Sequence, residues 1–397
     1  MLHIRYRTAR RRTGLWIAAA LTIICMVALV SVAVVRGYAV SGRQTVTVMT
    51  RNIYLGGDIN RPIRAAYDRA GREGLLALGH ANHELREIVD RTDFRSRSKL
   101  LANEIAAARP DLVGLQEVAL WRHGPMQLDQ IGRLNATQVD YDFLDTLLAD
   151  LADRGVRYQI VHIQQESDVE APAFTGDPFA GTASSAEDVR LTDRDVILVR
   201  SGAEIRIEGS GGSNYSQHLD VNLADTAFRF VRGYAWADVA VGSAHIRFIT
   251  THLESQSPKL ASAQAGELLA GLANLSQSIV ITCDCNSNPV SPAAHSGIPI
   301  GSGAAYRLIT NDHGFADLWL QQGHAGPGNT ASLGELVSDN SADFSRRIDL
   351  VLAKAAPAAQ LVTSRAEVTG DELNDRDTVT RLWPSDHAGV VVQLEIG

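Results

Sequence analysis

Apolar runs of strand length recur along most of this sequence, and several of them stop directly at a polar residue. Wholly apolar or alternating runs of this length are typical of β-strands. They lie at 46–48, 111–117, 195–200, 228–241, 246–251, 279–283, 347–353 and 389–395. Gly242 and Ser243 follow the fourth run, which indicates a hairpin with the fifth. Strands therefore outnumber helices, and such pairing favours a mixed sheet covered by helices over a purely parallel sheet.

Three segments space their apolar residues as an amphipathic helix does, namely 100–105, 143–151 and 261–275. Pro110 and Gly155 are placed to end the first two helices. Stretches rich in Gly, Ser and Pro, at 165–187 and 287–304, are expected to be loops inside the domain. No internal repeat is visible, so we expect one α/β domain of the α+β type over 46–397.

The amino terminus has a different character. An uncharged run of 21 residues covers 15–35, and a helix of that length crosses a hydrocarbon core of about 30 Å. Five Arg precede the run and two follow it closely, which predicts a cytoplasmic amino terminus. We expect a basic cytoplasmic segment (1–14), a transmembrane anchor (15–35), a linker (36–45) and an exported domain on a single-pass membrane protein. The alternative is a secretory signal, and a cleaved one would yield a secreted protein.

Charge is divided unevenly along the chain. The first 43 residues hold seven Arg and no acidic residue, so the rest carries 30 basic against 45 acidic side chains. An acidic body repels phosphate backbones at long range, which disfavours a nucleic-acid substrate without excluding one. We expect a monomer that acts on a phosphoester.

Three cysteines are too few for a disulfide scaffold. Cys283 and Cys285 are two residues apart in an expected strand, where we expect their side chains to point to opposite faces and therefore not to bridge each other. A zinc site is disfavoured because no second Cys or His pair completes four ligands.

Six groups of polar residues stand at the ends of the expected strands, where loops carry function. They are Asn52, Glu117, His252, Asp284 with Asn286, Arg347 with Asp349, and Ser385-Asp386-His387. Each alone is more typical of a turn or a helix cap. Asp349, however, lies in an apolar strand, and a buried carboxylate needs a partner such as His387.

In order and spacing these groups resemble the endonuclease/exonuclease/phosphatase superfamily, which has the deoxyribonuclease I-like fold. The most specific pieces are Leu115-Gln116-Glu117, Asp284-Cys285-Asn286, Arg347-Ile348-Asp349 and Ser385-Asp386-His387, and the resemblance covers about Thr45 to the carboxyl end. It implies a four-layer sandwich of two mixed β-sheets flanked by helices. It also implies hydrolysis of phosphoesters with Mg²⁺ or Mn²⁺.

The resemblance also implies roles for individual residues. Glu117 would be the main metal carboxylate, Asn52 would lie beside both metal and phosphate, and Asp386 would assist the metal or position His387. Mg²⁺ keeps most of its waters and needs few protein ligands, which suits this small set.

Around the phosphate, His252 and Asn286 would hydrogen-bond the phosphoryl oxygens, and Asp284 would orient or deprotonate the attacking water. Asp349 and His387 would form a carboxylate–imidazole pair, which keeps the imidazole protonated above its free pKa of about 6.5. Phosphoryl transfer asks mainly for such positioning and charge stabilisation.

Some positions depart from the family pattern or match it loosely. Cysteines flank Asp284 where the family commonly has Gly and an apolar residue. Asp58 is either an extra metal or substrate contact or a turn residue. We interpret Trp319 as core and Thr330 as a possible site-lining residue.

These observations predict an extracytoplasmic, metal-dependent phosphoesterase, with a phospholipid headgroup or a small phosphoester favoured as substrate. The alternatives are an extracellular nuclease and a non-catalytic surface protein that keeps the fold.

Overall fold

Asn52 ends the first of the strands in the computed structural model, which describes residues 43–289, 303–323 and 326–397. The expected anchor at 15–35 lies outside these residues, as does most of the expected loop 287–304. Within the described part of the chain, no helix is long and apolar enough to cross a membrane. Residues Gln44–Gly397 form one compact unit.

The first sheet has eight strands, and seven of them follow the order β15-β16-β1-β2-β6-β3-β4. β1 (Gln44–Asn52) runs parallel to β2 (Leu112–Gln116) and antiparallel to β16 (Gly389–Ile396), so the sheet is mixed. The other strands are β3 (Leu120–Pro125), β4 (Gln138–Asp142), β5 (Tyr158–Thr175), β6 (Ser184–Arg200) and β15 (Leu361–Thr369). β5 pairs with β6.

The second sheet has six strands in the order β13-β14-β12-β11-β10-β7. β11 (Ala244–His252) and β12 (Ser278–Asp284) are parallel, whereas β12 and β14 (Asp349–Lys354) are antiparallel, so this sheet is mixed too. The remaining strands are β7 (Ile205–Asn214), β10 (Gly233–Val241) and β13 (Ala316–Asp317). β10 and β11 form the predicted hairpin.

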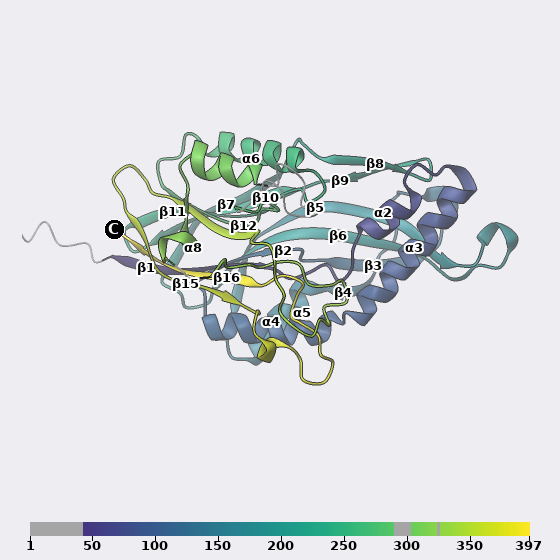
Figure 1. Ribbon diagram of the computed structural model, residues 1–397, viewed down its shortest axis with the longest axis horizontal. Coiled ribbons are helices and arrows are strands. Elements are labelled where there is room, and N and C mark those ends of the chain that lie inside the picture. Colours follow the sequence, from purple (N-terminus) through teal and green to yellow (C-terminus); the bar gives the residue numbers. More distant parts are fainter. Residues whose placement is uncertain (1–42, 290–302, 324–325) are drawn as a thin grey trace, which may run out of the picture. The chain divides into compact units, whose positions relative to one another are not determined.

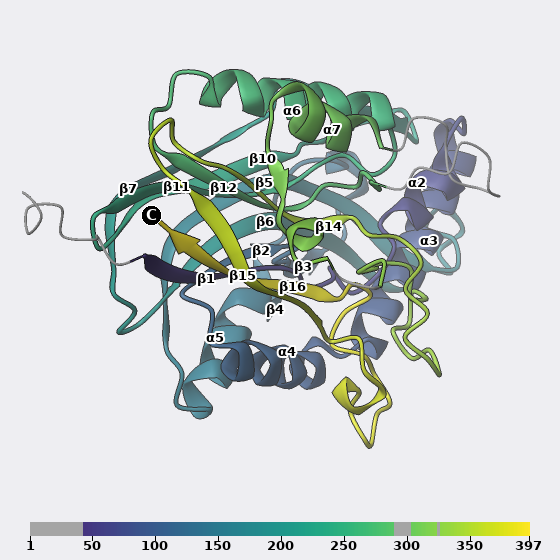
Figure 2. The ribbon, with the colours of Figure 1, turned by 60° about the vertical axis from the view of Figure 1, so that its left-hand side comes forward.

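The two sheets face each other, and helices cover their outer faces (Figures 1 and 2). Apolar side chains of both sheets, such as Val48 and Val280, share the core between them. α3 (Gly71–Arg91), α4 (Phe94–Ala108) and α5 (Phe143–Asp153) pack on the first sheet. α6 (Pro258–Leu272) and α7 (Ala304–Arg307) pack on the second. The prediction of two mixed sheets flanked by helices is confirmed.

Near the ends of β2, β11 and β12 the space between the sheets is narrow and polar. Gln116 donates a hydrogen bond from Nε2 to Oγ1 of Thr250 over 2.7 Å. A Cβ on Gly114 would collide with the hydroxyl oxygens of Thr250 and Thr282. Glycine is therefore required here for close approach of the sheets rather than for a turn.

Two sequence expectations were wrong in the β5–β9 region. The stretch 165–187, expected to be a loop, mostly continues β5 and β6 into a long hairpin with irregular register. The run 228–241 is divided between β9 (Thr226–Phe230) and β10, because β9 pairs with β8 (Leu219–Leu223) in a separate two-stranded sheet. Sequence reasoning also missed α2 (Asn60–Ala66) and α3.

Candidate active site

The sheet register brings the predicted polar residues to one edge of the sandwich. In the second sheet His252 is the register partner of Asp284, and Asp284 is the partner of Asp349. In the first sheet Asn52 is the partner of Gln116, and Glu117 follows directly. Strand pairing alone therefore aligns side chains that lie about 30 to 65 residues apart in the sequence.

Three residues at these strand ends have left-handed backbone conformations. Tyr54 has φ 62°, Glu117 has φ 58° and Asn286 has φ 43°. Non-glycine residues adopt such angles rarely, and they cluster at functional sites where the surrounding structure enforces them.

Asp284 is the centre of the constellation. Asn52 donates from Nδ2 to its Oδ2 over 3.0 Å, and the backbone N–H of Asn286 donates to its Oδ1 over 3.1 Å. Nε2 of His252 lies 3.4 Å from Oδ2, and Nδ1 of His387 lies 3.8 Å from the same oxygen. Burial raises the pKa of Asp284 to about 6, so this carboxylate is poised to exchange a proton near neutral pH.

His387 and Asp349 form the predicted pair. Nδ1 of His387 donates to Oδ2 of Asp349 over 2.8 Å. Burial lowers the pKa of His387, but the carboxylates of Asp349, Asp386 and Asp284 outweigh burial and hold the pKa well above its ordinary value. These carboxylates therefore favour the protonated imidazolium form of His387.

His252 has the opposite charge state. Burial, followed by the positive charges of Arg232 and His387, holds the pKa of His252 well below its ordinary value. Nη1 of Arg232 donates to Nδ1 of His252 over 2.8 Å. Since a guanidinium only donates, Nδ1 is the acceptor and Nε2 carries the hydrogen. The Asn286 amide nitrogen lies 3.0 Å from that Nε2 and donates to the Leu253 carbonyl over 3.0 Å.

Sequence reasoning missed Arg232. It is buried, and it also donates to Oδ2 of Asp193 over 3.0 Å and lies 3.7 Å from Oε2 of Glu166. An isolated Arg in a strand-like run gave no signal. Its partner His252 becomes its neighbour only once β10 and β11 pair.

Glu117 lies on the other side of the same cleft and accepts a hydrogen bond from the Leu55 N–H over 2.8 Å. Burial, followed by the charges of Asp386 and Asp193, raises the pKa of Glu117 to about 7. Burial also raises the pKa of Asp386. His387 lowers the pKa of both groups and Arg97 lowers that of Asp386, but burial outweighs these charges, which leaves a deficit of positive charge.

A divalent cation fits that deficit. Carboxylate oxygens of Asp284 lie within 4.8 Å of one of Glu117 and of one of Asp349. In addition, Oδ1 of Asp349 is buried without a hydrogen-bond partner among the described residues. Carboxylate oxygens are the ligands that Mg²⁺ and Mn²⁺ prefer.

The side chain of Asn52 makes hydrogen bonds at both its oxygen and its nitrogen, which the sequence did not predict. Its Oδ1 accepts from the Tyr54 N–H over 2.9 Å while its Nδ2 holds Asp284. It lies beside Glu117 and Asp284, and its contact with Asp284 orients that carboxylate, while its predicted place beside metal and phosphate stays a prediction.

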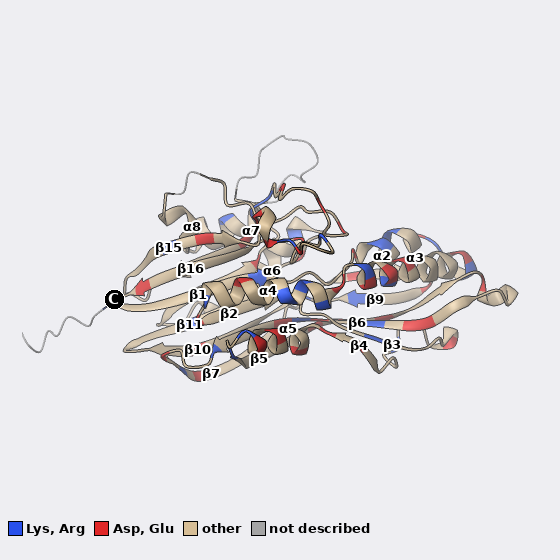
Figure 3. Cartoon of the chain, turned by 90° about the horizontal axis from the view of Figure 1, so that it is seen from below, with Lys and Arg blue, Asp and Glu red and all other residues tan. Residues whose placement is uncertain are grey.

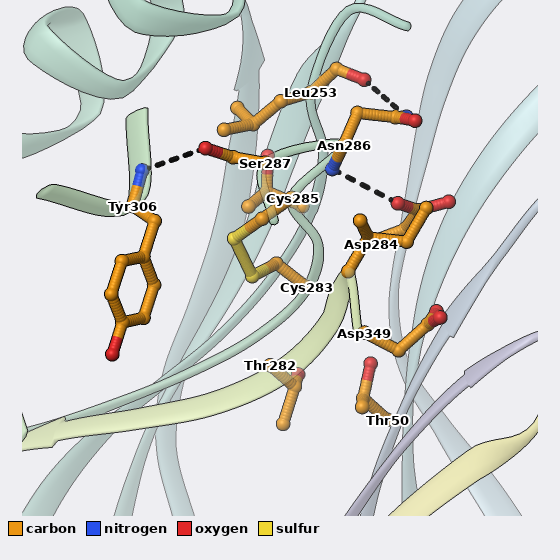
Figure 4. Close-up of a disulfide and its surroundings, with 12 residues drawn as sticks. Thr50, Leu253, Thr282, Cys283, Asp284, Cys285, Asn286, Ser287, Tyr306 and Asp349 are labelled. Carbon is orange, nitrogen blue, oxygen red and sulfur yellow. Dashed lines mark hydrogen bonds between the residues drawn. A yellow bond between two sulfur atoms is a disulfide. The ribbon is translucent and has the colours of Figure 1, made fainter. Parts of the chain in front are cut away.

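Cys283 and Cys285 form a disulfide, so the prediction that they do not bridge each other was wrong (Figure 4). Side chains two residues apart in a strand share a face rather than pointing to opposite faces, and β12 ends at Asp284, between the two cysteines. Beyond it the chain turns and brings the two Cα atoms to 5.0 Å, inside the range of normal disulfides. The sulfurs pack in the apolar cluster near Tyr306, while Asp284 points away from them.

Thr330 is fully buried, and its hydroxyl oxygen accepts from the backbone N–H groups of Ile348 and Asp349. It thus supports the strand that carries Asp349. Trp319 packs against the core between the sheets, as expected. Asp58 lines the cleft, but its carboxylate caps the start of α2 through the Asn60 N–H and pairs with Arg64.

One cleft of about 470 Å³ joins these groups. Its polar end is lined by the predicted residues Glu117, His252, Asp284, Asn286, Asp386 and His387, together with Arg232.

The fold and the arrangement of these side chains define the class. The protein has the fold of the endonuclease/exonuclease/phosphatase superfamily, so the resemblance seen in the motifs is confirmed at the level of fold. A family member from Bacteroides thetaiotaomicron is similar with a TM-score of 0.51, 13% identity, and coverage of 89% of this chain and 98% of its own.

Two further solved structures are similar in the same way. A family protein from Leptotrichia buccalis has a TM-score of 0.49, 15% identity and coverage of 88% and 99%. A mannosyl-6-phosphatase from Bacteroides thetaiotaomicron has a TM-score of 0.49, 14% identity and coverage of 88% and 99%. No family model and no curated protein matches the sequence.

Proposed function

We propose that this protein is a metal-dependent phosphoesterase that hydrolyses phosphodiester or phosphomonoester bonds outside the cytoplasm. The observation that carries the proposal is the placement of Asp284 between a neutral His252 and a charged His387, in one cleft with Glu117.

Different residues would bind the metal ion and accept the proton of the attacking water. Glu117 and Asp386, with Asn52 beside them, would hold Mg²⁺ or Mn²⁺, which when bound supplies positive charge to the phosphoryl oxygens. Asp284 accepts the proton of the attacking water, since its pKa of about 6 leaves it ionised at neutral pH yet basic enough to accept.

The two histidines and one amide act on the phosphate. His252 donates from Nε2 and Asn286 donates from its side-chain amide to phosphoryl oxygens. His387, protonated and held by Asp349, adds a charged donor where negative charge accumulates.

The proposed location rests on the amino-terminal sequence. The uncharged run 15–35 with its preceding Arg would anchor the chain, leaving the catalytic unit outside the cytoplasm. Protease treatment of intact cells should then degrade the unit Gln44–Gly397, and resistance to the protease would contradict this location.

The activity is tested on a chain of residues 43–397, which keeps every strand of both sheets. It should hydrolyse bis-p-nitrophenyl phosphate with Mg²⁺ and stop when a chelator is added. Asp284→Asn should lose at least about 100-fold in kcat, with an unchanged melting temperature as the control. Normal turnover in that variant would favour the alternative of a non-catalytic surface protein and a contaminating activity.

A further inference from the structure

One wall of the cleft is apolar. Ile59 and Ile63 at α2, Val169 of β5, Leu219 of β8 and Phe230 of β9 line it, and all five are only half-buried. Partly exposed apolar side chains gathered beside a polar catalytic end are typical of a site that binds an apolar group next to its reacting group.

A small pocket of about 50 Å³ continues this wall beneath α2 and α3. It shares five lining residues with the cleft, namely Ile59, Ile63, Val169, Leu191 and Phe230. Its other walls include Leu78, Trp121 and Phe228. The amide of Asn82, its polar lining group, already donates to the carbonyls of Ala171 and Pro172.

The β8–β9 hairpin closes this side of the cleft. It belongs to neither large sheet, and a two-stranded sheet is marginal alone. It is held by apolar contacts of Val221, Leu223 and Phe228 with Ala66 and Leu78 of the two helices. The apolar wall is therefore built from three separate parts of the chain.

The charges along the cleft do not suit a long polyanion. Among its described lining residues the Arg side chains are Arg232, which is bound to Asp193, and Arg346. Asp58, Glu254 and Glu335 lie along the same cleft. In the view of Figure 3, basic and acidic residues are interspersed along α2 and α3. Phosphates beyond the reacting one would meet no track of cations.

We propose that the wall formed by Ile59, Ile63, Val169, Leu219 and Phe230 binds an apolar group of the substrate, so that the substrate is an amphiphilic phosphoester. This rests on the proposed function, because the phosphate is placed at Asp284 and His387. The apolar group belongs either to a membrane lipid or to a soluble ester.

A series of methyl, butyl and octyl p-nitrophenyl phosphodiesters tests the inference, since all three share one phosphate and one leaving group. Each methylene that is half covered is worth about twofold, so kcat/KM should rise about eightfold from methyl to butyl with Mg²⁺ present, and further to octyl. Faster hydrolysis of the octyl ester in phosphatidylcholine vesicles than as a monomer identifies a lipid source, and the reverse identifies a soluble one.

Ile63→Asn and Phe230→Asn should each lower the octyl-to-methyl ratio of kcat/KM. Val139→Asn is the matched control, because Val139 is 59% exposed and lies on β4 away from the cleft lining. If either variant fails to fold, the ester series on the unaltered chain still shows whether the wall binds an apolar group.

Mg²⁺-dependent hydrolysis at one rate for all three esters would overturn the inference and leave the proposed function standing. Preference for plasmid DNA over the octyl ester would overturn it as well. No hydrolysis of any ester would contradict the proposed function itself, and the inference with it.

Discussion

Arg232 donates a hydrogen bond to Nδ1 of His252 over 2.8 Å, and this contact fixes which nitrogen of the imidazole carries the hydrogen. It places a neutral donor at Nε2, whereas His387 across the cleft is charged. The two histidines therefore have different tasks although both would contact phosphate.

Replacing Arg232 by Lys should lower kcat/KM about 10- to 100-fold, because the Lys ammonium is one atom nearer the backbone than Nη1, the nitrogen that contacts both His252 and Asp193. Without the hydrogen bond from Arg232, the ¹⁵N chemical shift of His252 Nδ1 should move away from the value of an unprotonated nitrogen that accepts a hydrogen bond. Arg206→Lys, at a side chain 70% exposed, is the control. An unchanged shift at Nδ1 would contradict the role given to Arg232.

Asp349→Asn should move the alkaline limb of the pH–rate profile to lower pH. In the proposed function His387 acts when protonated, so activity should be present below the pKa of His387 and be lost as the pH rises through that pKa. Asp349 helps hold that pKa well above 6.5, and its loss lowers the pKa. If the alkaline limb lies at the same pH in the unaltered protein and in Asp349→Asn, a group other than His387 controls that limb.

Mg²⁺ should stabilise the folded chain in the absence of substrate. A ligand at 100 times its Kd that binds only the folded state adds about 2.7 kcal/mol to the free energy of unfolding. Thermal unfolding with and without Mg²⁺ measures the effect. Glu117→Gln should remove most of the Mg²⁺-dependent shift, and an equal shift in that variant would exclude Glu117 as a ligand.

The double variant Cys283→Ala, Cys285→Ala should be about 1–2 kcal/mol less stable, because the bridge closes only a short loop. Its kcat should fall roughly 10- to 100-fold, since the bridge fixes the backbone that carries Asp284 and Asn286.

The bridge itself can be checked on the chain 43–397. Iodoacetamide should add no mass to the denatured, unreduced chain and two groups after reduction, because this segment contains only these two cysteines. Two groups added without reductant would show that the bridge is absent.

The sequence was sufficient for those parts of the site that depend on strand ends. Asp284 and Asp349 follow or begin apolar strands, and pairing of those strands places the two residues opposite each other. The identity of their neighbours followed from the family motifs.

Other parts depend on contacts that no local pattern encodes. Arg232 acquires its role only when β10 pairs with β11, and the disulfide depends on where β12 ends. The β5–β6 hairpin is stabilised by cross-strand pairs such as Arg190 with Asp168, so its polar sequence resembles a loop.

The narrow gap at Gly114 and the apolar wall of the cleft are built by different parts of the chain. The spacing between the halves of the reaction centre is set by small and hydroxyl side chains deep between the sheets, Gly114, Thr250 and Thr282. The apolar wall is built by α2 and the β8–β9 hairpin, outside that contact. A substitution in the hairpin can therefore reshape the apolar wall without changing the close contact of the two sheets at Gly114.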